Sequence, residues 1–221
     1  MPRVLLGVGV VAVAAALISI AVGEGGPGSS QEIGGINDVQ RIYGGIQQDD
    51  AYLGPEDAEV TVTFFNDIQC TVCAEYQLET IDPLVEDYAR PGGVRLEYRH
   101  FSLAPNDTTL AAIAAEAAGE QGRQWQYLDL FARNQDLAGG EVDEELLREI
   151  AEAVPELETS EWDDAFADPA AEDRVREDAM LAAELELPAE PAVVVSGPRG
   201  QRELIETPSR GEIEEAIAAV G

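Results

Sequence analysis

The alternation of apolar and polar residues predicts a strand, a helix and a second strand in the first half of the chain. The stretch "VTVTFF" at residues 60–65 is β-branched and aromatic, and it predicts the clearest strand. From Cys70 to about Tyr88 the pattern is helical, with a kink or break expected at Pro83. "VRLEYRHF", which starts at Val94, alternates as a second strand.

Residues from about 105 to 187 read as mostly helical, and "VDEELLREIAEAV" places its apolar residues on one face. After them, "PAEPAVVVSGPRGQRELIE" predicts two strands joined by a turn. The final segment is an amphipathic helix, with Ser209 and Glu212 in capping-box register. This order predicts an α/β protein with a thioredoxin-like fold and a helical domain inserted at about 105–187.

The N-terminal residues 4–22 are an uninterrupted apolar run of 19 residues, about the length that crosses a bilayer. Arg3 before the run and Glu24 after it favour an N-terminus on the inner side. We favour a retained anchor within residues 1–23; the alternative is a cleaved signal peptide, because "AVG" at 21–23 resembles a cleavage site. In both cases the rest of the chain is extracytoplasmic, tethered to the membrane or secreted, where disulfides are permitted.

Residues 24–48 contain many Gly and Ser and predict a flexible tether, and residues 49–221 form the predicted domain. The formal charge is −31, from 44 acidic residues and 13 basic residues, all of them arginine. Such a surface repels phosphate backbones, so we expect no nucleic-acid partner.

Cys70 and Cys73 are the two cysteines of the chain, and they lie where the first strand gives way to a helix. A helix N-terminus favours a thiolate, so Cys70 is the predicted attacking thiol and Cys73 the resolving thiol. One alternative is part of a metal site, in which the cysteine pair and His100 would serve a metal carrier, although zinc requires four ligands. Another is a structural disulfide, but so short a loop constrains the unfolded chain little.

The surroundings of the pair resemble the DsbA-like thiol–disulfide oxidoreductases, in particular their membrane-anchored bacterial branch. The resemblance covers roughly residues 50–220. It rests on five segments: "YLGPEDAEVTVTFFNDIQCTVC", "VRLEYRHFSL", "AAEAAGEQGRQWQYLDLF", "VDEELLREIAEAV" and "LELPAEPAVVVSG".

The resemblance implies an enzyme that forms disulfides in exported proteins through the Cys70–Cys73 pair, with no other cofactor and no metal. Pro191 would be a cis-proline facing the pair, where the backbone of Glu190 contacts the substrate chain. A quinone-linked membrane protein would reoxidise the cysteines. The alternatives are a reductase or isomerase of the same fold, or an anchored binding or metal-carrier protein without turnover.

Three departures from the family pattern concern details of this site. Thr71 and Val72 stand where the family often has Pro and His, so we expect a milder oxidant. Phe64 stands where many thioredoxin-like proteins have a buried carboxylate; Asp67 is the nearest acidic residue before the pair, and it is either a proton-transfer group or a loop residue. Glu190 adds a negative charge that would disfavour a nearby thiolate and acidic substrates.

Overall fold

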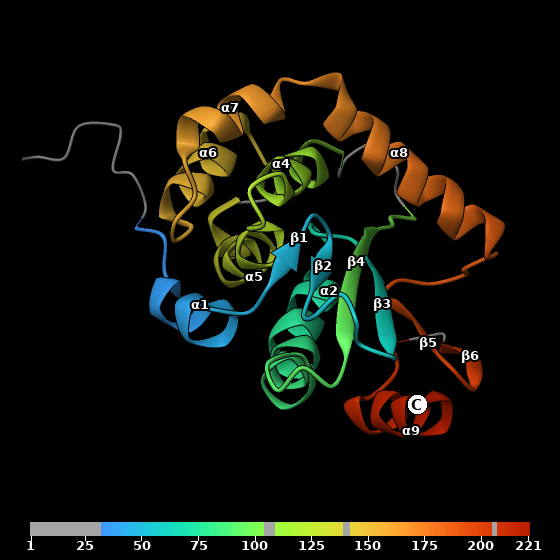
Figure 1. Ribbon diagram of the computed structural model, residues 1–221. Coiled ribbons are helices and arrows are strands. Elements are labelled where there is room, and N and C mark those ends of the chain that lie inside the picture. Colours follow the sequence, from blue (N-terminus) through green and yellow to red (C-terminus); the bar gives the residue numbers. More distant parts are fainter. Residues whose placement is uncertain (1–31, 104–108, 139–141, 205–206) are drawn as a thin grey trace, which may run out of the picture. The chain divides into compact units, whose positions relative to one another are not determined.

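In the described residues, six strands form one mixed sheet with the order β1-β2-β4-β3-β5-β6 (Figure 1). The computed structural model describes residues 32–103, 109–138, 142–204 and 207–221, all within the compact unit Glu32–Gly221. The central strand β3 pairs in parallel with β4 and antiparallel with β5. The strands are β1 Gln48–Asp49, β2 Tyr52–Leu53, β3 Thr61–Asn66, β4 Arg95–His100, β5 Ala192–Gly197 and β6 Gly200–Leu204.

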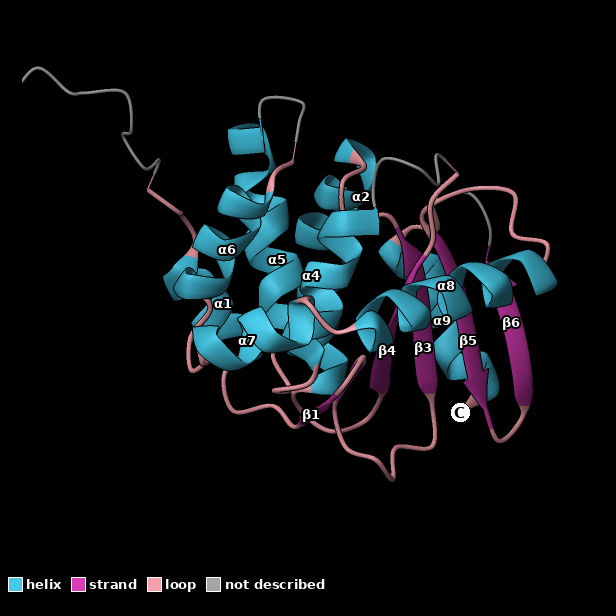
Figure 2. Cartoon of the chain, turned by 90° about the horizontal axis from the view of Figure 1, so that it is seen from above, coloured by secondary structure: helices cyan, strands magenta, loops and turns pink. Residues whose placement is uncertain are grey.

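Helices cover both faces of this sheet because β3 and β5 are apolar on both sides. On β3, Phe64 joins the core that contains the C-terminal helix, whereas Phe65 joins a second core that contains the last helix of the inserted block. Neighbouring residues of a strand point to opposite faces, so this strand is buried on both. Figure 2 shows the two covering helices, α8 and α9, beside the strands.

The inserted helical block is present and spans α4 to α8, close to the predicted limits of 105 and 187. The final helix begins as predicted: Ser209 N–H donates to the Glu212 carboxylate at 2.8 Å, and Glu212 N–H donates back to Ser209 Oγ at 3.4 Å. The helices of the block and of the C-terminus are α4 Thr109–Gly119, α5 Gln124–Asn134, the 3-10 helix η3 Gln135–Ala138, α6 Glu144–Ala153, α7 Thr159–Phe166, α8 Pro169–Glu184 and α9 Arg210–Val220.

The helix after the cysteines does not break at Pro83. It continues from Thr71 to Ala89 because the hydrogen bonding shifts to π-helical turns on both sides of the proline. At the end of the first of these, Asp82 N–H donates to the carbonyl of Gln77, five residues earlier. The segments are α2 Thr71–Tyr76, η1 Gln77–Ile81, α3 Asp82–Leu84 and η2 Val85–Ala89.

The tether predicted at residues 24–48 is wrong in its second half. Helix α1, Ile36–Tyr43, buries three apolar side chains, and Asn134 of α5 fixes its start by bonding both the N–H and the carbonyl of Gly34. The apolar residues of "INDVQRIY" recur at helical spacing, and this pattern outweighs the neighbouring glycines. The two-residue strands β1 and β2 then form a hairpin.

No helix within the described parts of the chain is both long and apolar enough to cross a bilayer. The predicted anchor or signal peptide at 1–23 and the first part of the tether lie outside the described residues.

Candidate active site

The two cysteines lie where the central strand β3 meets the helix α2. Two local bonds shape the connection: Cys70 N–H donates to the Asp67 carbonyl at 3.3 Å, and Gln69 N–H donates to the Asp67 carboxylate at 2.9 Å. Cys70 is the N-cap of α2, with extended backbone angles. The strand, the turn and the cap together hold Cys70 at the exposed end of a buried strand.

The environments of the two thiols differ. Cys70 is partly exposed, whereas the side chain of Cys73 is buried, and both are free thiols. The N–H of Cys73 points at the Cys70 sulfur, with 3.4 Å between the two atoms. An N–H in this position stabilises a thiolate at Cys70. The arrangement therefore leaves the Cys70 thiol accessible to other molecules, with the Cys73 thiol buried behind it.

Burial raises the pKa of the Cys73 thiol well above its usual range. The neighbouring Cys70 and the charge of Glu190 raise it further, while the backbone N–H of Asp67 lowers it. Cys73 therefore keeps its proton at neutral pH, and attack on another molecule falls to Cys70.

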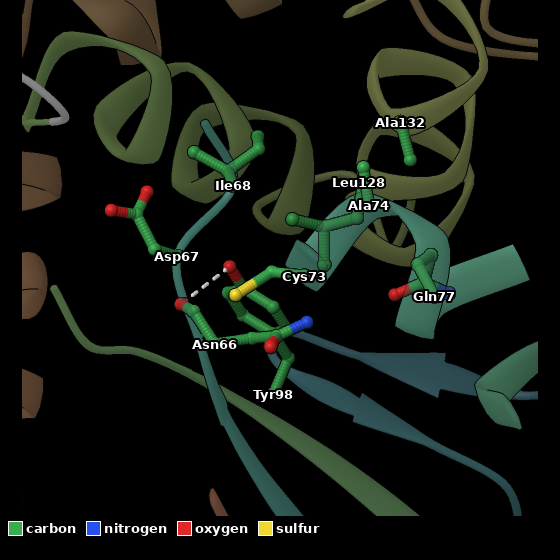
Figure 3. A pocket seen from close by; sticks show the side chains of 9 residues that line it. All are labelled: Asn66, Asp67, Ile68, Cys73, Ala74, Gln77, Tyr98, Leu128 and Ala132. Atoms are coloured by element: carbon green, nitrogen blue, oxygen red, sulfur yellow. Dashed lines mark hydrogen bonds between the residues drawn. The ribbon is translucent and has the colours of Figure 1, made fainter. Parts of the chain in front are cut away.

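A small cavity lies behind Cys73 (Figure 3). Its walls combine polar side chains from β3, β4 and α2 with apolar ones from α5. Within it, the Tyr98 hydroxyl donates to the carbonyl of Asn66 at 3.0 Å. The lining residues are Asn66, Asp67, Ile68, Cys73, Ala74, Gln77, Tyr98, Leu128 and Ala132.

Phe64, six residues before Cys70, is fully buried and packs edge-on against Trp125, with 6.3 Å between ring centroids. Asp67 is also buried, but Figure 3 shows its carboxylate turned away from the Cys73 sulfur. Its carboxylate bonds Gln69 N–H, which is the role of a residue that shapes the turn before the helix. The proton-transfer role of Asp67 stays a prediction.

The peptide bond between Glu190 and Pro191 is cis, which confirms the expectation from the family resemblance. The carbonyl of Pro191 accepts the N–H of Thr207 at 3.1 Å. The Glu190 carboxylate accepts the N–H of Leu103 at 2.8 Å, so it ties the strand after the cis bond to the loop after β4. Burial raises the pKa of the Glu190 carboxyl, the Leu103 N–H lowers it, and the nearby charge of Asp67 raises it again.

His100 lies at the end of β4, paired with Asn66 of β3, and is buried. Its backbone N–H donates to Asp178 at 2.9 Å, and burial lowers the pKa of its imidazole. A search of the described residues for three or more His, Cys, Asp or Glu side chains placed to bind one metal ion found no such group. The side chain of His100 is packed between β4 and its surroundings and is 5% exposed.

Two polar residues of the cavity, Gln77 and Tyr98, were missed by the sequence reasoning. Both had a usable signal. Gln77 lies one helical turn after Cys73, on the same face of the helix. Tyr98 lies on β4, which runs parallel to β3, and its side chain points to the opposite face of the sheet from those of its two neighbours in the strand. A polar group at either position faces the resolving thiol.

Comparison with known proteins places the chain in a family. The family model described as "Thioredoxin" matches residues 47–216. The chain is 28% identical over 149 residues to the "Probable disulfide bond formation protein D" of Bacillus anthracis, covering 66% of this chain and 69% of that protein.

Two solved structures share the fold. The oxidised BdbD of Bacillus subtilis is 20% identical, with a TM-score of 0.61, over 78% of this chain and 95% of that one. The DsbA of Chlamydia trachomatis is 19% identical, with a TM-score of 0.64, over 76% and 89%. The chain belongs to the thioredoxin family, as a DsbA-like thiol–disulfide oxidoreductase.

Proposed function

We propose that this protein forms disulfides in exported proteins through the Cys70–Cys73 pair. The observation that carries the proposal is the asymmetry of the pair: a partly exposed Cys70 that caps a helix, and a buried Cys73 whose pKa is raised. The names of the relatives, which include disulfide bond formation proteins, support the same direction.

The reaction starts from the oxidised pair. A substrate thiolate attacks the Cys70 sulfur, the Cys70–Cys73 bond breaks, and Cys73 leaves and takes up a proton. A second substrate thiolate then attacks the substrate sulfur of the mixed disulfide, and Cys70 leaves as a thiolate facing the Cys73 N–H. The substrate loses two electrons and the cysteine pair gains them.

Three further residues have proposed roles in this cycle. The substrate chain binds at the backbone of Glu190, beside the cis bond to Pro191, and Asp67 assists the proton exchange of Cys73. Membership of the family supports the first role, and the burial of Asp67 with its N–H near the Cys73 sulfur supports the second.

The reaction takes place outside the cytoplasm, with the protein held at the membrane by residues 1–23 or secreted after their cleavage. The apolar run at 4–22 supports export. A quinone-linked membrane protein reoxidises the pair, since each substrate disulfide leaves it reduced. The pair itself is the redox centre, with no additional cofactor.

Replacing the resolving thiol tests the proposal. In Cys73→Ala, the Cys70 thiolate can still attack a disulfide of a partner protein, whose other sulfur leaves as a thiol. No internal thiol then releases the mixed disulfide, so covalent complexes should accumulate. Cys70→Ala is the matched control and should trap nothing. If Cys73→Ala traps no partner and a metal copurifies stoichiometrically, the protein is a metal carrier and the proposal fails.

A titration of the pair in glutathione buffers decides the direction. The absence of a cation or of His beside Cys70 predicts a potential between those of DsbA, about −120 mV, and thioredoxin, about −270 mV. A value well below that of thioredoxin would make the protein a reductase.

A further inference from the structure

A surface groove lies directly beside the cysteine pair. It runs between the helix that starts after Cys70 and the loop before α9, and its volume is about 230 Å³. Val72, between the two cysteines, forms one end of the groove and is 53% exposed. A peptide whose cysteine reaches Cys70 therefore passes the mouth of this groove.

Hydrogen bonds join the loop before α9, which forms the far wall of the groove, to the segments around the active site. The Tyr76 hydroxyl donates to the carbonyl of Pro208 at 2.7 Å, which joins the helix to the loop across the floor. One residue earlier, Thr207 N–H bonds the carbonyl of Pro191, next to the cis bond. The groove therefore lies on the same surface as the backbone of Glu190, where the substrate chain is proposed to bind.

The groove is negative, and no cation is found among the described residues that line it. Glu75 and Glu79 line it, both are exposed, and neither forms an ion pair with another described residue. They lie four residues apart, so their carboxylates project from the same face of the helix. The neighbouring Arg210 is already held by Asp87 at 2.6 Å and by Glu214 at 2.7 Å.

Resting on the proposed function, we propose that this groove selects substrate segments that carry a lysine or arginine close to the reactive cysteine. The cationic end groups pair with Glu75 and Glu79. The aliphatic stem of the same side chain packs on Val72 and on the exposed edge of the groove floor. The occupant is an extended, basic, cysteine-containing segment of an exported protein.

The acidity of the whole chain alone would attract basic peptides without regard to where their charge lies. Selection by the groove depends on the position of the charge, because only a peptide whose cation reaches Glu75 or Glu79 gains the contact. A matched control exists on α6: Glu145 and Glu149 also lie four residues apart and form no ion pair with another described residue. Replacing either pair by glutamine changes the net charge equally.

The test uses the full-length oxidised chain and two peptides with one cysteine each, identical except for Arg or Gln three residues after the cysteine. The rate constant for mixed-disulfide formation is measured for each peptide, and the ratio of the two is the preference. We expect Glu75→Gln/Glu79→Gln to reduce the preference about threefold to tenfold, and Glu145→Gln/Glu149→Gln to leave it unchanged. The reduction should shrink as salt is added.

An equal change in both double variants, or no change in either, overturns the inference. Every variant is measured with the same two peptides. Any effect of Arg on the reactivity of the peptide's own thiol is therefore the same in each variant and cancels in the comparison. The rate with dithiothreitol, which carries no charge, keeps the two proposals separate. A chain that does not exchange with dithiothreitol contradicts the proposed function, whereas exchange without a charge preference contradicts only the selection by the groove.

Discussion

Two neighbouring regions of the molecule differ in whether their carboxylates are paired with arginine. The first, here called the Arg133 cluster, comprises Tyr43, Gln77, Asp82, Asp129 and Arg133. Arg133 binds Asp82 at 2.7 Å and Asp129 at 2.9 Å, and the Tyr43 hydroxyl donates to Asp82 at 2.6 Å. Burial raises the pKa of both carboxyls, and the arginine lowers it.

The second region is the cysteine site, whose carboxylates receive no arginine. Within the described residues, none of Asp67, Glu75, Glu79 and Glu190 forms an ion pair. Gln77 belongs to both regions, since it lines the cavity behind Cys73 and donates to the Tyr43 hydroxyl at 2.9 Å.

The difference shows how this chain uses its few cations. Arg99, Arg133 and Arg174 each bind carboxylates that are buried in the fold, where an unpaired charge costs most. At the cysteine site, whose carboxylates form no ion pair within the described residues, the backbone N–H of Cys73 is the group that faces the Cys70 sulfur. We therefore expect the site to be a milder oxidant than one with a cation beside its thiol.

Removing the arginine from the first region should have the largest effect. Arg133→Met leaves Asp82 and Asp129 buried without a cation, so we expect the free energy of unfolding at pH 7 to fall by about 3–5 kcal/mol. Arg148→Met is the control: that arginine is about half exposed with its partners Glu152 and Asp163, and its loss should cost under about 1 kcal/mol. Urea denaturation of both variants measures the difference. Equal losses in the free energy of unfolding would show that the Arg133 cluster contributes no more than an exposed ion pair.

Glu116 provides a second test of how the fold treats buried carboxylates. Its side chain is buried, whereas the side chain of its partner Arg174 is only partly buried. Burial, with a contribution from Asp178, raises its pKa to about 7, although Gln124 and Arg174 lower it. The folded state therefore holds this proton more tightly than the unfolded chain, and the resulting stability is lost as pH rises from about 4.5 through 7.

In Glu116→Gln the side chain cannot ionise. We expect the wild type to lose about 3 kcal/mol relative to this variant between pH 4.5 and 8. Denaturation midpoints across that range test it, and parallel curves for the two proteins would contradict the raised pKa.

Adding a cation to the second region should have the smallest effect. Val72→His places an imidazole beside Cys70, where its charged form stabilises the thiolate. We expect the potential of the pair to rise by about 30 mV, a tenfold change in its equilibrium with glutathione. Val72→Gln, which adds polarity without charge, is the control, and an equal rise in that variant would argue against an electrostatic cause.

The sequence alone predicted the elements that depend on local pattern. The strand at 60–65, the hairpin after Pro191 and the capping box at Ser209 each follow from a few adjacent residues. Helix α1 was missed because nearby glycines resembled a linker, and its apolar face acquires meaning only when it packs on α5.

The site was predictable in part for the same reason. Cys70 and Cys73 lie on one helical turn, and the family resemblance pointed to the cis bond before Pro191. The cavity and the groove were not predictable, since segments distant in the chain form their walls. Tyr76 and Pro208, for example, meet only in the folded molecule.

The pairing of β3 with β5 also has a consequence for biosynthesis. A ribosome completes β3 and the cysteines well before it reaches Ala192, the first residue of β5. Until then, β3 has an open edge with apolar side chains on both faces, which invites pairing with other chains. We expect the nascent protein to depend on chaperones or export factors during this interval, while both of its thiols are already present.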